Sequence, residues 1–170
     1  NRLTDSFYFQ LAATYERTGD YEQAEKYFQQ SLQLAPDSPE TLNYLGYMWA
    51  DRGENLQEAR EMIEKAVKLE PKNAAFLDSL GWVLFKLDKP QDALRFIQQA
   101  IENNDEPDAT LYEHLGDIFA ALNKNNIDPQ SDVEVVAQPF DMSLFLNREV
   151  DAAAAMTYNE LAQVLEQENP

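Results

Sequence analysis

Apolar residues in the first part of the chain recur at spacings of three and four, the pattern of helices with one apolar face. This pattern predicts a helix over residues 5–17 and a second over 21–34. Gly19 lies between them and can take the left-handed conformation that ends a helix. The two helices are therefore expected to form a hairpin over residues 5–38, closed by Pro36.

The same two-helix pattern then repeats. Hairpins are predicted over residues 39–73 and 74–107, and half of one over 108–122. A Leu-Gly pair recurs every 35 residues, at Gly46, Gly81 and Gly116. A fixed period of this length indicates stacked repeats, because a single hairpin cannot cover its own apolar face. Glycine inside a helix costs about 0.5–1 kcal/mol relative to alanine, so its recurrence suggests that helices must approach closely there.

These residues resemble the tetratricopeptide repeat. The family pattern is a large residue, Leu-Gly, another large residue, a turn glycine, a large residue between two small ones, and proline. The matching residues are Tyr8, Leu11, Ala12, Tyr15, Gly19, Ala24, Phe28, Ser31 and Pro36 in the first unit, Leu42, Leu45, Gly46, Trp49, Gly53, Ala59, Ile63, Ala66 and Pro71 in the second, and Leu77, Leu80, Gly81, Leu84, Ala93, Ile97 and Ala100 in the third.

The resemblance implies an all-α fold over residues 5–122, in which antiparallel helix pairs stack into a right-handed superhelix. Three departures from the family pattern are local. The second unit has one extra residue in its turn, and the third has Asp88 where the others have glycine. The third unit also lacks the closing proline at its usual place.

Residues 123–170 do not continue the repeat. Residues 123–132 form a polar linker, 133–137 are strand-like, and 151–167 carry one apolar helical stripe. The expected role of residues 133–170 is to cap the last repeat. A second reading rests on a resemblance of residues 133–165 to periplasmic proteins that bind thiamine-precursor pyrimidines, which implies that Tyr158, Asn159 and Glu160 lie near a ligand. The rest of such a two-lobed domain is missing, so the activity does not carry over, and the segment is a cap or a fused fragment.

Charge and composition exclude several classes of function. The chain has 170 residues and a formal net charge of −18, which disfavours nucleic acids and anionic membranes as partners. It has no Cys and one His, so neither a metal site nor a catalytic triad is expected, and the prediction is a non-enzyme without a cofactor. No apolar run approaches the roughly 20 residues that span a bilayer. The compartment stays open between a bacterial cytoplasm and periplasm.

The repeat register predicts a concave groove along the first helix of each unit. The residues expected to point into it are Phe9, Ala13, Arg17, Asn43, Tyr44, Tyr47, Asp51, Asp78, Ser79, Trp82, Lys86, Glu113, His114 and Asp117. The aromatic residues Tyr44, Tyr47 and Trp82 are either exposed there or partly buried between repeats or under the C-terminal segment. Some family members hold the C-terminal carboxylate of chaperones through Lys, Arg and Asn side chains in these slots. Here those slots hold Phe9, Ala13, Tyr44 and Ser79, which predicts that this clamp is absent.

Three hypotheses for function follow. The first is a protein–protein interaction scaffold that binds a peptide or protein segment with basic and apolar residues in the groove. The second is a transport-linked protein that binds a small molecule through the C-terminal segment. The third is a self-association module, in which the groove of one copy takes the C-terminal helix of another. The sequence leaves the partner and the oligomeric state open.

Overall fold

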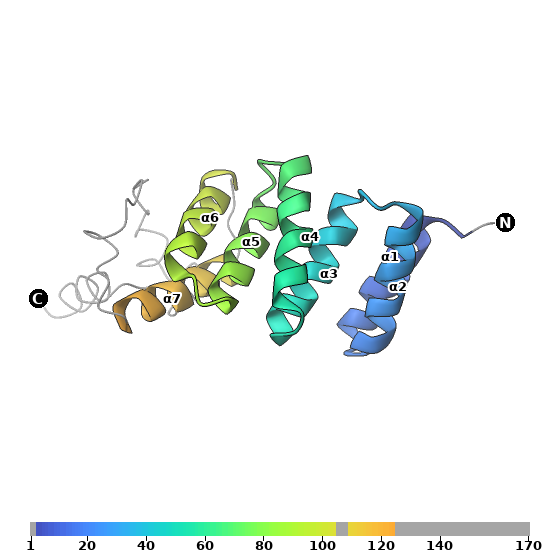
Figure 1. The fold of residues 1–170 in the computed structure, drawn as a ribbon, viewed down its shortest axis with the longest axis horizontal. Coiled ribbons are helices and arrows are strands. Elements are labelled where there is room, and N and C mark those ends of the chain that lie inside the picture. Colours follow the sequence, from blue (N-terminus) through green and yellow to red (C-terminus); the bar gives the residue numbers. More distant parts are fainter. Residues whose placement is uncertain (1–2, 105–108, 125–170) are drawn as a thin grey trace, which may run out of the picture.

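The computed structural model describes residues 3–104 and 109–124. These residues form seven helices and no strand (Figure 1). The helices are α1 (Asp5–Arg17), α2 (Tyr21–Leu34), α3 (Pro39–Arg52), α4 (Leu56–Leu69), α5 (Ala74–Lys86), α6 (Pro90–Glu102) and α7 (Ala109–Lys124). The predicted all-helical fold is confirmed for this part of the chain. The predicted linker, strand-like segment and C-terminal helix lie outside the described residues.

Short polar side chains start several of these helices. The side chains of Asp20, Ser38 and Asn73 each accept a hydrogen bond from a backbone N–H in the first turn of the next helix. Such caps satisfy donors that have no partner within the helix. Pro39 and Pro90 stand in the first helical turns, where a missing N–H costs nothing. Local sequence therefore sets where these helices begin.

The turns inside the hairpins require left-handed backbone. Gly19 and Gly53 take it, with φ of 80° and 70°. In the third hairpin Asp88 adopts φ of 59° at the position where the other units have glycine. Aspartate and asparagine tolerate this conformation better than most residues. The extra turn residue of the second unit is accommodated in the same way, because Asn55 has φ of 45°.

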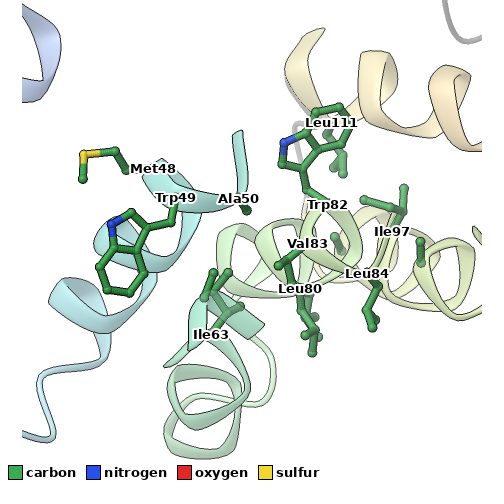
Figure 2. Close-up of a cluster of buried hydrophobic side chains, with 14 of the residues drawn as sticks. Met48, Trp49, Ala50, Ile63, Leu80, Trp82, Val83, Leu84, Ile97 and Leu111 are labelled. Carbon is green, nitrogen blue, oxygen red and sulfur yellow. The ribbon is translucent and has the colours of Figure 1, made fainter. Parts of the chain in front are cut away.

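The two helices of each middle hairpin approach closely at a glycine. A Cβ placed on Gly46 would lie 2.8 Å from Cγ1 of Ile63, and one on Gly81 would lie 2.7 Å from Cγ1 of Ile97. Both isoleucines are fully buried in the core shown in Figure 2. The recurring glycine is thus a packing requirement, as its spacing predicts.

The first helices of the hairpins line one side of the stack. Helix α1 contacts α3, α3 contacts α5, and α5 contacts α7. Figure 1 shows the pairs following one another along the long axis of the molecule. The faces of α1, α3, α5 and α7 that do not pack on the second helices therefore form a continuous surface.

Apolar residues at the margins of the repeats are less buried than the helical pattern predicts. Phe7 shares the three- and four-residue apolar spacing of helix α1, yet its side chain is exposed. Among the described helices, α1 contacts mainly α2 and α3, so less of its surface is covered than in the middle hairpins. Leu34 and Leu69 end the second helices of their hairpins, and both are also exposed.

Candidate functional site

A pocket lies on the surface made by the first helices. It has a volume of about 410 Å³ and is lined by residues of α3, α5, the start of α7 and the preceding turn. Five of the predicted groove residues line it, namely Asn43, Tyr44, Tyr47, Asp78 and Ser79. The remaining lining residues are Ala74, Ala75, Asn104, Thr110 and Leu111.

These other lining residues were missed because the predicted stripe stopped one turn short. Ala75 precedes Ser79 by four residues, and Thr110 precedes His114 by four. Extending the helical stripe back by one turn would have found both. Asn104 belongs to the turn before α7, where helical spacing gives no information.

The α3 side of the pocket carries aromatic side chains. Tyr44 is 46% exposed and meets the edge of Phe9 at a ring separation of 5.1 Å. Its ring centroid also lies 6.2 Å from that of Phe28, so Tyr44 packs on the first hairpin and is still partly exposed to solvent. Tyr47 is half-buried. The sequence left open whether these aromatic residues are exposed or partly buried. Tyr44 is exposed, and Tyr47 is partly buried.

Trp82 and His114 are buried, so neither is an exposed groove residue. The indole of Trp82 stacks on the imidazole of His114, with centroids 4.1 Å apart and an angle of 15° between the planes. His114 donates a hydrogen bond from Nδ1 to Oδ1 of Asp78 over 2.8 Å. These contacts join α5, the first helix of the third unit, to α7, the first helix of the fourth. The fourth unit therefore covers the third at this point. His114 thus packs between repeats and holds the carboxylate of Asp78 in place.

Five of the predicted groove residues are charged and lie outside the pocket. Lys86 Nζ lies 4.6 Å from the centre of the Trp82 ring and donates to the backbone carbonyl of Asp51 over 3.2 Å. The side chains of Arg17, Asp51, Glu113 and Asp117 are exposed. None of these five residues lines the pocket; they are charged positions elsewhere on the first helices and are here called the rim residues.

Three pKa shifts occur near this surface. A hydrogen bond from Arg52 lowers the pKa of Glu54, and the same bond raises the pKa of Arg52. Burial raises the pKa of the Tyr112 phenol above its ordinary value. Across residues 3–104 and 109–124, no three His, Cys, Asp or Glu side chains gather in a group that could hold a metal ion.

Comparison with known proteins identifies the repeat. Models of the tetratricopeptide repeat match residues 3–70, 51–105 and 79–125. The chain belongs to the tetratricopeptide repeat family. This fold is consistent with a protein-interaction scaffold, and members of the family bind proteins or peptides. The resemblance of residues 133–165 to solute-binding proteins receives no support from these relatives.

Individual relatives share the repeat but differ in overall size. The TPR repeat-containing protein PA4667 of Pseudomonas aeruginosa is 41% identical over 102 residues, which is 60% of this chain and 17% of that protein. The TPR domain of Sgt2 from Aspergillus fumigatus superposes with a TM-score of 0.66 at 18% identity, covering 82% of this chain and 92% of that one. An O-GlcNAc transferase mutant from Thermobaculum terrenum gives 0.64 at 23% identity, covering 83% and 30%.

These likenesses bear on the fold and the repeat only. The chain spans less than a quarter of the length of the curated relatives it matches. Within the described helices, none is long and apolar enough to cross a membrane.

Proposed function

We propose that the chain is a non-enzymatic scaffold that binds an extended or helical peptide segment along its first helices, across the pocket between α3 and α5. The segment carries basic and apolar residues. The observation that supports this most directly is Tyr44, a large aromatic side chain that lines the pocket and remains 46% exposed. Exposed aromatic side chains beside a pocket are typical anchors of protein interfaces.

Charge supports a basic partner. The rim residues Asp51, Glu113 and Asp117 are exposed carboxylates, and the whole chain carries a net charge of −18. Complementary charge raises the rate of encounter and selects among partners more than it adds affinity. A segment with basic residues on its flanks and an apolar residue against Tyr44 matches both features of the surface.

The test is selection of peptides from a random display library against the full chain, followed by affinity measurement by fluorescence anisotropy. Replacing Tyr44 with Ser is expected to weaken binding by roughly tenfold or more, because an aromatic anchor is lost. The matched control is Leu69→Ser. Leu69 is similarly exposed, at 48%, but lies at the end of α4, outside the pocket.

The control variant is expected to bind within about twofold of the original chain. Equal losses at Tyr44 and Leu69 would show that peptides attach to apolar surface without using the groove. A library that yields no enriched peptide would contradict the scaffold function itself.

A further inference from the structure

The pocket between α3 and α5 contains a buried hydrogen-bond acceptor without a partner. Asn43 is 7% exposed and lines the pocket, and among the described residues its Oδ1 has no hydrogen-bond donor. A buried polar atom left unpaired costs free energy, so such atoms are rare in folded proteins. The amide oxygen of a residue that lines the pocket is thus an acceptor that a donor group of a ligand would satisfy.

A held carboxylate lines the same pocket. The side chain of Asp78 is 16% exposed, and its Oδ1 accepts the hydrogen bond from His114. His114 is itself fixed by stacking on Trp82. An ionised carboxylate accepts several hydrogen bonds, and the bond from His114 uses only part of this capacity. Asp78 is therefore a negatively charged acceptor whose orientation is set before a ligand arrives.

Ser79 adds to this polarity. Its hydroxyl donates to the backbone carbonyl of Ala75 over 2.9 Å, which occupies its proton and leaves its lone pairs to accept. Among the residues that line the pocket in the described part of the chain, none is Lys or Arg. The pocket is thus supplied with acceptors and negative charge, and its complement is a cation that carries several donors.

We propose that this pocket holds the ammonium or guanidinium group of one Lys or Arg side chain of the bound segment, with Asn43 and Asp78 as its acceptors. The inference rests on the proposed peptide-binding function and names the side chain that the groove selects. A metal ion is a poor occupant, because no three His, Cys, Asp or Glu side chains gather among the described residues. An organic cation also suits the ring of Tyr47, which lines the pocket, since aromatic rings attract cations.

The decisive experiment is a double-mutant cycle on a peptide selected against the full chain. Each Arg of the peptide is replaced in turn by citrulline, and each Lys by norleucine, and the dissociation constant is measured by fluorescence anisotropy. One position is expected to lose roughly 10- to 100-fold in affinity, as for a charged hydrogen bond. The variant Asp78→Asn is expected to cause the same loss and to abolish the further loss on neutralising that position.

The Asp78→Asn variant is chosen because asparagine keeps an oxygen that can accept from His114 while it removes the charge. Asp51→Asn is the matched control, since it removes the same charge from an exposed rim position outside the pocket. That control is expected to change affinity by less than about twofold, because exposed charges are screened.

The variant Asn43→Leu distinguishes a role of Asn43 in ligand binding from a role in stability. Because Asn43 Oδ1 has no hydrogen-bond partner among the described residues, an apolar side chain of similar volume is expected to raise the thermal midpoint. The same variant is expected to lower the affinity for the cationic peptide severalfold. A residue with only a structural role would lower both or leave affinity unchanged.

Several results would overturn the inference. Peptides that bind in the groove but tolerate neutralisation of every Lys and Arg would refute the cation site and leave the scaffold function standing. A cation dependence that persists unchanged in Asp78→Asn would place the cation elsewhere. A dimer in light scattering that dissociates in Asp78→Asn would show that a second copy occupies the pocket. Failure to select any peptide would remove the scaffold function and this inference together.

Discussion

The first hairpin and the two middle hairpins share one sequence pattern but are buried to different depths. Leu11, Leu45 and Leu80 occupy the same register position. Leu45 is 1% exposed and Leu80 is 3% exposed, whereas Leu11 is only half-buried. The middle hairpins have a neighbour on both sides, and the first has one. The difference shows that the pattern specifies which face packs, while the number of neighbours decides how completely it packs.

The position where the two helices of a hairpin approach most closely, here called the seam, differs between the hairpins as well. The middle hairpins place Gly46 against Ile63 and Gly81 against Ile97. In the first hairpin the corresponding residues are Ala12 and Phe28, both fully buried. The first hairpin therefore buries a methyl group at the position where the middle hairpins have none. Both residues of the seam thus differ between the first and the middle hairpins.

Truncating the shared leucine gives the largest expected effect and tests the comparison directly. Leu45→Ala should lower the free energy of unfolding by about 2–5 kcal/mol, because it removes fully buried atoms and leaves a cavity. Leu11→Ala should cost clearly less, since water already reaches part of that side chain. Urea denaturation followed by circular dichroism measures both. Equal losses would show that the first hairpin is as tightly packed as the middle ones.

The helices could be predicted from the sequence because their signals are local. Apolar spacing marks each helix, and capping residues, prolines and turn glycines mark its ends. Asp88 replaces the turn glycine of the third unit, and its backbone takes the same left-handed conformation as the glycines of the other turns. Repetition of these signals at one period was enough to give the stacked fold.

The exposure of the site residues could not be predicted in the same way. Trp82 and His114 are 32 residues apart in the chain, and they bury each other through contact between successive units. The register shows which side of a helix a residue occupies, but the size of the neighbour's side chain decides whether it is covered. The unpaired oxygen of Asn43 is a further property of the packed structure, and no spacing in the sequence signals it.

Exchanging glycine and alanine at the seam tests whether the first and the middle hairpins need different residues there. Gly81→Ala places a Cβ 2.7 Å from Cγ1 and Cδ1 of Ile97 and should destabilise the protein by about 1–3 kcal/mol through overpacking. The better helix propensity of alanine offsets part of this cost. Ala12→Gly in the first hairpin should also destabilise, by about 1 kcal/mol, because there alanine fits and glycine weakens the helix.

Thermal or urea denaturation measures these changes, and a second substitution identifies their cause. Ile97→Val removes Cδ1, so Gly81→Ala should cost less in that background than in the original chain. If the cost of Gly81→Ala stays the same, steric conflict with Ile97 is not its source. A stabilising Gly81→Ala would show that the seam relaxes and that helix propensity prevails.

The smallest effect is expected at the junction between the two regions. Trp49 of α3 donates a hydrogen bond from Nε1 to Oε2 of Glu25 of α2 over 3.1 Å, linking the first hairpin to the second. Glu25→Ala leaves this largely buried N–H without that acceptor and should cost about 1 kcal/mol. Glu25→Gln retains an oxygen at the same place and should cost less. Amide hydrogen exchange in α1 and α2 distinguishes the outcomes. If exchange speeds up in both helices of Glu25→Ala, the first hairpin is held partly by this bond; if it is unchanged, apolar contact alone holds it.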